Sequence, residues 1–395
     1  MKKKLNILTS ALFVCLLFGF CIAFWLLPDR DTSENENRNL QQLPTPSVEN
    51  WLDGSFSADF TDYCSDQFPL RDEWIRLSAL YDIALGRGES NGVLLGQDGQ
   101  QVRRLFTAWR SRTEQVENTD LYDTAHVDKC LSALNALDGK LSEQGIPLTV
   151  LLAPRTVDVV AAADYPFALS DRLHEQVEAG LSEVRHVDLT ASFRTRCAAG
   201  EYLMYRTDHH WTTRGAYLAY QALMETLGRA EETLPPEVFT VRQVEGFEGT
   251  VAARSGLPVT HPDRLELWET ANDAAYTVKD KRGELLLNGF VSEGYLATRD
   301  KYGAFLDGTH DLITVELTGT DPLASAARPR LLLARDSYAA ALIPFLARHY
   351  DIVSVSLPNG MTELSRLAAE YECDEVMILC NLENLISNDC LRYVD

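Results

Sequence analysis

Several short, almost wholly apolar segments recur along the chain, bounded by turn residues and separated by helical patterns. They have the length and composition of buried strands: Leu148 to Ala153, Arg330 to Ala334, Ile352 to Leu357 and Glu375 to Cys380. Val184 to Leu189 is a further, more polar stretch that favours a strand. Strands that alternate with helices are typical of a parallel sheet covered by helices on both faces. The pattern therefore predicts an α/β fold with a parallel sheet flanked by helices.

Helical spacing marks the segments between these strands. Thr212 or Thr213 can cap a helix that runs to about Leu227, and further helices are predicted over residues 338–348 and 361–371. Ahead of the first strand, four leucines recur at helical spacing: Leu131, Leu134, Leu137 and Leu141. Residues 234–327 break this rhythm, with strand-like stretches at 276–278 and 312–317, and we interpret them as a β-rich insertion.

The N-terminus carries a run without charge, residues 5–27, directly after Lys2 to Lys4. At about 1.5 Å per residue, a helix of this length spans a hydrocarbon core of about 30 Å. The lysines before it and the acidic residues after it direct the rest of the chain outward. We predict a signal-anchor over 1–27, a tether over 28–50 and an extracytoplasmic domain over 51–395 of a single-pass cell-membrane protein. A cleaved signal peptide is the alternative.

The 395-residue chain has a formal net charge of −22. A protein this acidic repels a polyphosphate backbone, so we expect no nucleic-acid partner. Six cysteines lie outside the apolar N-terminal run. In an extracytoplasmic domain they are compatible with disulfides, and the sequence leaves their pairing open. Their spacing does not match that of a zinc site.

Reactive side chains gather in two segments. One is the polar stretch 205–217, which contains an Asp-His-His-Trp sequence at 208–211. The other is the end of the strand at 330–334, which Ser337 follows closely. Ligands of open parallel sheets bind beyond the carboxyl ends of the strands. Ser337 is therefore expected at such a place, with its backbone N–H at a helix N-terminus where it can donate to an oxyanion.

A serine hydroxyl becomes a good nucleophile when a base takes its proton and a third group orients that base. In an extended segment, residues two apart point to one side, so Asp208 can orient His210 while His209 faces the other way. This predicts Ser337 as nucleophile, His210 as general base and Asp208 as the orienting carboxylate.

Other interpretations of the two segments stay open. Asp336 and Ser337 after a strand also fit an ordinary helix cap. The Asp-His-His sequence also fits a metal site or a hydrogen-bonded cluster under Trp211. The other six histidines are scattered without ligand spacing. We therefore predict no metal and no other cofactor.

Together the two segments resemble the DHHW protein family and, more distantly, the alginate O-acetyltransferase family with its SGNH hydrolase-like fold. The first motif is Thr-Asp-His-His-Trp-Thr-x-x-Gly-Ala-Tyr at 207–217, and the second is Arg-Asp-Ser-Tyr-Ala at 335–339. Supporting similarities lie at 34–38, 66–72, 152–155 and 301–308. The resemblance implies a circularly permuted SGNH hydrolase-like catalytic domain, in which the Asp-x-His pair precedes the serine.

Carried over residue by residue, the resemblance gives Ser337, His210 and Asp208 the roles stated above. SGNH hydrolases have Gly before the Asp-Ser pair, whereas this chain has Arg335. The Gly-x-Asn-Asp pattern that carries the oxyanion asparagine is also absent at the strand end 380–384. Five further candidates for substrate or oxyanion contact follow from the resemblance: Asn381, Asn384, Tyr302, Gly308 and Trp211.

The resemblance implies a membrane-anchored O-acetyltransferase that acts on a cell-surface or secreted polysaccharide. Its implied partners are that polysaccharide and a membrane-bound O-acyltransferase that delivers the acetyl group. A carbohydrate acetylesterase with the same triad and a non-enzymatic glycan-binding or scaffold protein are the alternatives. Transfer and hydrolysis share one acyl-enzyme, so the sequence does not separate them.

Overall fold

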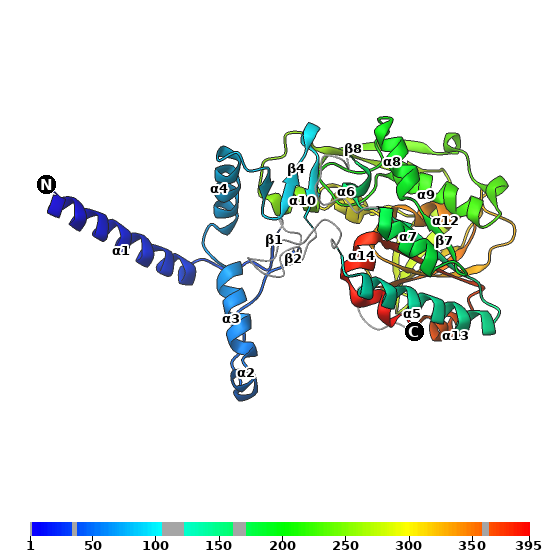
Figure 1. The fold of residues 1–395 in the computed structure, drawn as a ribbon, viewed down its shortest axis with the longest axis horizontal. Helices are drawn as coiled ribbons and strands as arrows, with labels where there is room; N and C mark the ends of the chain where they lie inside the picture. Colours follow the sequence, from blue (N-terminus) through cyan, green and yellow to red (C-terminus); the bar gives the residue numbers. More distant parts are fainter. Residues whose placement is uncertain (1, 34–37, 105–121, 161–170, 358–362) are drawn as a thin grey trace. The chain divides into compact units, whose positions relative to one another are not determined.

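The computed structural model describes residues 2–33, 38–104, 122–160, 171–357 and 363–395 (Figure 1). The chain divides into two units, one of residues 1–91 with 252–258 and one of residues 92–251 with 259–395. Residues 34–37 of the first similarity above, and the first two residues of the helix expected over 361–371, lie outside the described residues.

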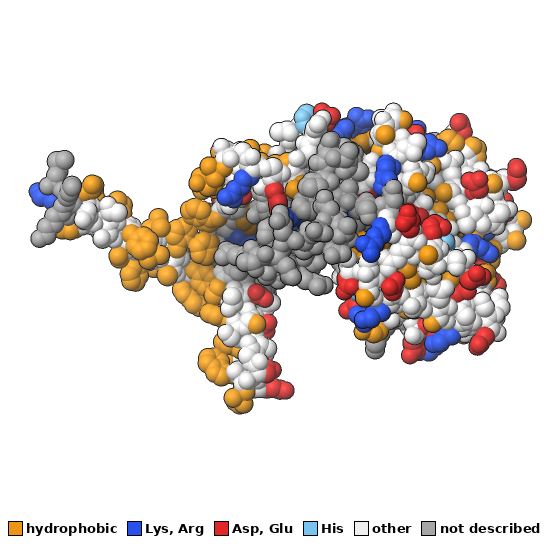
Figure 2. All heavy atoms as spheres, in the orientation of Figure 1, with side chains coloured by type: hydrophobic (Ala, Val, Ile, Leu, Met, Phe, Trp, Pro, Cys, Tyr) orange, Lys and Arg blue, Asp and Glu red, His pale blue; other side chains and the backbone are white. Residues whose placement is uncertain are grey.

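The first unit begins with α1 (Lys2–Leu26), which is long and apolar enough over Lys4–Leu26 to cross a membrane. Figure 2 shows hydrophobic side chains along it, most densely toward its C-terminal half. It is compatible with the predicted single-pass anchor; the division into anchor, tether and catalytic domain stays a prediction. The other elements of this unit are β1 (Thr32–Ser33), β2 (Arg38–Asn39), α2 (Val48–Leu52), α3 (Ser55–Asp66), α4 (Arg71–Ala84) and β3 (Glu89–Ser90).

A mixed sheet organises the second unit, and within the described residues it has eight strands in the order β11-β10-β12-β14-β13-β15-β6-β7. Their bounds are β6 (Leu148–Ala153), β7 (Arg185–Asp188), β10 (Tyr276–Asp280), β11 (Leu285–Asn288), β12 (Leu312–Leu317), β13 (Arg330–Arg335), β14 (Asp351–Ser356) and β15 (Glu375–Asn381). The strands from β14 to β7 run parallel. The predicted parallel sheet is confirmed for this part.

The predicted β-rich insertion adds antiparallel strands to the parallel part of the sheet. β10, β11 and β12 pair antiparallel and extend the main sheet beyond β14. The other strands of this region, β8 (Thr240–Phe247) and β9 (Asp263–Glu269), form a separate antiparallel pair. Outside the insertion, β4 (Val93–Leu95) and β5 (Gln101–Arg103) also pair antiparallel. Only a few residues separate β10 from β11 and β4 from β5, and such short connections join antiparallel neighbours, whereas a parallel pair needs a long crossover.

Helices bury both faces of the sheet. Alternate residues of β13 enter opposite cores, Leu331 and Leu333 on one side and Leu332 and Ala334 on the other. The first core is covered by α8, α9 and α12, and the second by α5, α7, α13 and α14, of which α5, α13 and α14 lie together in Figure 1. Continuous apolar strands buried on both faces are what the sequence pattern predicted.

The helices of this unit are α5 (Thr124–Glu143), α6 (Thr156–Val159), α7 (Asp171–Gly180), α8 (Thr190–Ala198), α9 (Thr213–Thr226), α10 (Thr250–Ser255, whose last residues belong to the first unit), α11 (Glu293–Leu296), α12 (Ile343–Leu346), α13 (Leu364–Glu370) and α14 (Leu382–Ser387). Its 3₁₀ helices are η1 (Gln97–Gly99), η3 (Ala230–Glu232), η4 (Pro236–Val238), η5 (Asp273–Ala275), η6 (Lys301–Ala304), η7 (Ser337–Ala341) and η8 (Asp389–Tyr393). The single helix expected over 338–348 is therefore wrong. Pro344 is tolerated only in a first helical turn, so α12 starts anew after η7.

Candidate active site

Ser337 lies where the sequence placed it, just past the carboxyl end of a buried central strand. β13 is held on both sides by parallel neighbours, β14 and β15. Asp336 leaves the strand and caps η7, its side chain accepting from the backbone N–H of Tyr338 at 3.0 Å. Ser337 is therefore the first residue of η7 and is partly exposed, while the residues on either side of it are buried.

Asp208 and His210 lie on a tight turn. Tyr205 donates its backbone N–H to the carbonyl of His210 at 3.2 Å, and Met204 pairs with Trp211. Asp208 Oδ1 accepts from the backbone N–H of His210 at 3.0 Å and lies 2.5 Å from His210 Nδ1. The side chains of Asp208 and His210 are paired as predicted. The prediction assumed an extended backbone, which is wrong, because the backbone forms a turn.

The same turn changes the position of His209. Its ring centroid lies 3.9 Å from that of His210, on the same side of the loop. We expected His209 to face the other way, as in a strand. A turn does not keep the alternation of a strand, which explains the difference.

Groups far along the chain hold the turn in place. The buried carboxylate of Asp263 accepts from the backbone N–H groups of Arg206 and Thr207, at 3.0 and 2.8 Å, and from the hydroxyls of Thr207 and Tyr202. On the other side, Thr250 donates its backbone N–H and its hydroxyl to Asp208 Oδ2, at 2.8 and 3.0 Å.

A glycine permits this second contact. A Cβ on Gly249 would lie 2.2 Å from the Cβ of Asp208, so the 249–250 backbone approaches the turn only because that side chain is absent. Gly215 in α9 has a comparable role, since a Cβ there would lie 2.5 Å from the carbonyl oxygen of Leu203. This accounts for the Gly of the Thr-x-x-Gly sequence after the Asp-His-His-Trp motif.

The two predicted segments meet at His210. His210 Nε2 lies 2.7 Å from Ser337 Oγ, so the side chains of Asp208, His210 and Ser337 form one hydrogen-bonded chain. Burial alone would raise the pKa of Asp208, but the rings of His210 and His209 and the hydrogen bonds from His210 hold that pKa below its usual value. An ionised Asp208 requires an N–H at His210 Nδ1, which leaves Nε2 to accept from the serine hydroxyl.

An aromatic wall fixes the plane of the His210 ring. Tyr302 stacks on it with a centroid distance of 3.9 Å and an interplanar angle of 8°, and its hydroxyl donates to the Ser337 carbonyl at 3.3 Å. Trp211 is fully buried and donates its indole N–H to the carbonyl of Tyr338 at 3.0 Å. Trp211 therefore packs the two segments together, and its buried ring offers no stacking face to a sugar.

The remaining residues carried over from the resemblance separate into two groups. Asn381 and Asn384 line one pocket with Ser337. The amide of Asn381 donates to the carbonyls of Ala153 and Pro154, at 3.2 and 3.0 Å. Gly308 does not line that pocket; it has a positive φ, and a Cβ there would meet the hydroxyl of Tyr295 at 2.5 Å.

Asp336 links the serine to the neighbouring strand end. Its Oδ2 accepts from the backbone N–H of Asn381 at 2.6 Å and from the Asn384 amide at 2.8 Å. Burial raises the pKa of Asp336, against the opposing effect of these donors. One amide hydrogen of Asn384 is used in this way, and a second belongs to the same group.

Arg335, which stands where SGNH hydrolases have Gly, is buried against β14. It donates from Nε to Ser354 Oγ at 3.1 Å and from Nη2 to the His310 carbonyl at 3.2 Å. Burial lowers the pKa of Arg335. The departure thus places a guanidinium in the wall of the pocket beside Ser337.

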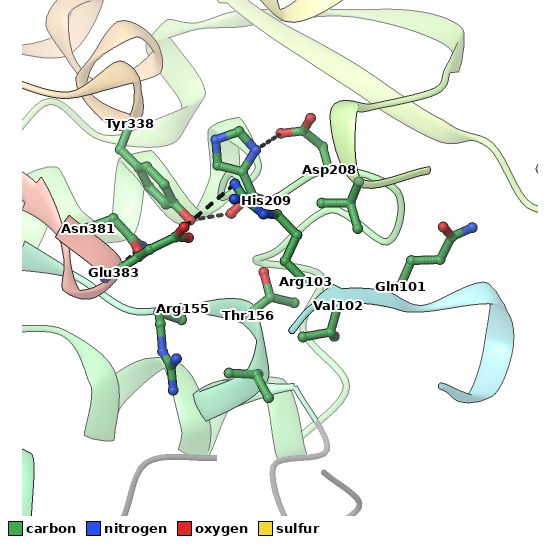
Figure 3. Close-up of a pocket in the computed structure, with 12 residues that line it drawn as sticks. Gln101, Val102, Arg103, Arg155, Thr156, Asp208, His209, Tyr338, Asn381 and Glu383 are labelled. Carbon is green, nitrogen blue, oxygen red and sulfur yellow. Dashed lines mark hydrogen bonds and ion pairs between the residues drawn. The ribbon is translucent and has the colours of Figure 1, made fainter. Parts of the chain in front are cut away.

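Ser337 opens into a pocket of about 300 Å³, which His209 also lines. A second, narrower pocket shares His209, Tyr338 and Asn381 with it, and Figure 3 shows that pocket. Arg103 and Glu383 line both pockets, and their charged groups lie 3.6 Å apart. The hydrogen-bonded chain therefore faces a cavity of the size of a small substrate group.

The chain is similar in sequence and in fold to known proteins. Residues 93–289 match the family model for the SGNH hydrolase-like domain of the acetyltransferase AlgX. The crystal structure of a DHHW family protein from Eubacterium siraeum superposes with a TM-score of 0.60 at 20% identity, covering 77% of this chain and 96% of that one. This chain therefore has an SGNH hydrolase-like fold; it is similar in sequence to the AlgX domain and in fold to the DHHW family protein.

Two probable alginate O-acetylases and a further solved structure are also similar to this SGNH hydrolase-like chain. A probable alginate O-acetylase AlgJ from Pseudomonas syringae pv. tomato is 24% identical over 251 residues, 62% of this chain and 58% of that protein. One from Pseudomonas fluorescens is 23% identical over 237 residues, 58% and 53% of the two chains. The matches thus span little more than half the length of these relatives. The structure of Bacillus cereus PatB1 with a sulfonyl adduct superposes with a TM-score of 0.57 at 17% identity, covering 77% and 97%.

The SGNH hydrolase-like site also contains residue types that bind metal ions. Among the described residues, Asp208, His209 and His210 form a group whose ligand atoms lie within 4.8 Å of one another. Their ring and carboxylate atoms already bond to one another, to Thr250 and to Ser337. A metal ion would have to displace this network, whereas a serine nucleophile uses it as it stands.

Sequence reasoning missed Thr250, Asp263 and Arg103. None lies in a recognisable motif, and each reaches the site from a distant part of the chain. Gly249 followed by Thr250 is the one local signal, and it becomes meaningful only when Asp208 is known to lie against it.

Proposed function

We propose that the chain is a membrane-anchored, extracytoplasmic O-acetyltransferase that modifies hydroxyls of a cell-surface or secreted polysaccharide through Ser337, His210 and Asp208. The observation that carries the proposal is the continuous hydrogen-bonded chain from Asp208 to Ser337, with distances of 2.5 and 2.7 Å, at the edge of a pocket. The relation to the acetyltransferase AlgX and to probable alginate O-acetylases supports an acetyltransferase-like activity.

In the proposed first step, Ser337 Oγ attacks the acetyl carbonyl of the donor while His210 Nε2 takes its proton. Asp208 stabilises the imidazolium that forms, and that imidazolium then protonates the leaving group of the donor. The backbone N–H of Ser337 and the second amide hydrogen of Asn384 are the proposed donors to the oxyanion. In the second step, a sugar hydroxyl attacks the acetyl-serine, passes its proton to His210, and Ser337 regains its hydroxyl.

The proposed location follows from α1, which fits a single-pass anchor. The acetyl group would then be delivered on the outer side of the membrane by a membrane-bound O-acyltransferase, the partner that the family resemblance implies. Ser337 chemistry itself needs no nucleotide, metal or redox cofactor.

Acetyl transfer from p-nitrophenyl acetate to an oligosaccharide tests the proposal. The full-length chain in detergent is expected to release p-nitrophenol and to yield acetylated oligosaccharide, and Ser337→Ala is expected to do neither. Undiminished turnover in Ser337→Ala would overturn the assignment. Release of p-nitrophenol without acetylated product, together with removal of acetyl groups from a pre-acetylated oligosaccharide, would favour the acetylesterase instead.

A further inference from the structure

His209 is a pocket residue to which the triad gives no role. It lines the pocket shared with Ser337, and its ring lies against that of His210. Its backbone carbonyl accepts from the hydroxyl of Tyr338. These contacts fix the position of the backbone and of the ring, which is only partly buried.

The hydrogen bonds of Thr250 determine which ring nitrogen of His209 carries a proton. A hydroxyl has one hydrogen to donate, and Thr250 Oγ1 gives it to the carboxylate of Asp208 at 3.0 Å. His209 Nδ1 lies 3.0 Å from the same Oγ1 and must therefore be the donor in that contact. Burial and the neighbouring His210 lower the pKa of His209 to about 3, so its ring is neutral near pH 7. Nε2 is consequently an acceptor.

This acceptor nitrogen lies on the side of the ring that faces away from Asp208. Figure 3 shows the two ring nitrogens on opposite sides, one toward Asp208 and the other away from it. Within the described part of the chain, no side chain or backbone group donates to Nε2. Arg103 and Glu383 lie across the same pocket.

From this arrangement we infer, resting on the proposed function, that His209 Nε2 accepts a hydrogen bond from a second hydroxyl of the acceptor, adjacent to the one that is acetylated. The attacking hydroxyl must give its only proton to His210 Nε2, so it cannot also donate to His209. Two neighbouring imidazole acceptors therefore fit two neighbouring hydroxyls. The preferred acceptor class is a vicinal diol, as found on sugar rings, rather than an isolated alcohol.

The chemical step balances with the groups present. The bond between the acceptor oxygen and the acetyl carbon forms as the bond between that carbon and Ser337 Oγ breaks. The proton of the attacking hydroxyl passes to His210 Nε2 and then to Ser337 Oγ. The second hydroxyl keeps its proton throughout and only orients the acceptor.

A pair of small acceptors tests this inference in the full-length chain, with p-nitrophenyl acetate as donor. The probes are trans-cyclohexane-1,2-diol and trans-2-methoxycyclohexanol, which differ in whether the second oxygen can donate. A hydrogen bond contributes about 1 kcal/mol, about a factor of five, and the diol has a further factor of two from its two equivalent hydroxyls. We expect transfer to the diol to be about tenfold faster than transfer to the ether. Equal rates would overturn the inference.

Substitutions at His209 test whether this residue causes the preference for the diol. In His209→Leu the diol-to-ether ratio is expected to fall to about two, the statistical value, and in His209→Gln, which keeps an acceptor oxygen, to lie between the two. The matched control His186→Leu, at a histidine of β7 outside both pockets, should keep the wild-type ratio. Since each ratio is measured within one variant, changes in acetyl-enzyme formation cancel. An unchanged ratio in His209→Leu contradicts the inference, whereas absence of acetyl-enzyme in the wild type contradicts the proposed function itself.

Discussion

Ser337 and the Asp208–His210 pair reach the same hydrogen-bonded chain from two differently built regions. Ser337 follows a central strand whose apolar side chains are buried on both faces, so its position is set by the sheet. Asp208 and His210 lie on a turn with little regular structure, and buried polar contacts to Asp263 and Thr250 hold it. Apolar packing therefore positions the proposed nucleophile, and hydrogen bonding positions the proposed base.

The largest effect on turnover is expected from removing the side chain of Ser337 or that of His210. Ser337→Ala and His210→Ala should each lower turnover of p-nitrophenyl acetate by about 10⁴-fold, because the groups of such a chain act as a unit. For the same reason the double variant should be no slower than either single one. Initial rates of the three variants check this, with thermal unfolding as the control for folding. Additive losses would show that the two regions do not work together.

A second pair of variants distinguishes apolar packing beneath Ser337 from hydrogen bonding that holds the turn of Asp208 and His210. Leu333→Ala leaves a cavity in the core beneath Ser337, and Asp263→Ala leaves the donors of the turn without their acceptor. Each should lower the free energy of unfolding by about 3 kcal/mol. Turnover per folded molecule should fall only in Asp263→Ala, because only there is the base released from its position. Urea unfolding and kinetics at a temperature where both variants are folded provide the measurement.

The pH dependence of stability should have opposite signs in the two regions. The pKa of Asp208 is lowered in the folded protein, so its contribution is present above the unfolded value of 3.8 and is lost as the pH falls below it. The pKa of Asp336 is raised, so its protonation stabilises the fold as the pH falls toward 3.8.

Urea unfolding between pH 6 and about pH 3 compares the two carboxylates. Relative to the wild type, Asp208→Asn should lose stability less steeply on acidification, and Asp336→Asn more steeply. Only the slopes are compared, since each substitution also changes stability at neutral pH. Slopes that change in the same direction in both variants would contradict the assigned environments.

A smaller effect is expected from Thr250→Val, which removes the hydroxyl between Asp208 and His209 but keeps the shape of the side chain. Turnover should fall about tenfold, because Asp208 keeps the backbone N–H of residue 250 and both contacts to His210. Thr250→Ser, which retains the hydroxyl, should restore most of the rate. Equal losses in Val and Ser variants would assign Thr250 a packing role only.

The same contrast explains how much of the molecule the sequence reveals. The apolar runs of β6, β13, β14 and β15 predict their strands within one residue, because burial on both faces leaves a clear local pattern. The antiparallel addition of β10–β12 was not predicted. Which strands pair depends on contacts between distant segments, and no local pattern specifies them.

For the candidate site, the spacing of Asp208 and His210 and the place of Ser337 after a strand were sufficient to predict that the three residues form one site. The backbone between them was not predictable, because a turn fixed by Asp263 and Thr250 depends on partners more than forty residues away. His209 was misplaced for the same reason. A local rule for strands cannot describe a loop whose shape is set by tertiary contacts.

Labelling with a fluorophosphonate tests most directly whether Ser337 is activated by His210. We expect one covalent adduct in the full-length protein, on the peptide that contains Ser337, and its loss in His210→Ala although the serine is still present. Peptide mass spectrometry after a fixed labelling time gives the readout. An adduct on another residue, or labelling of Ser337 at the same rate without the imidazole, would contradict the activation of Ser337 by His210.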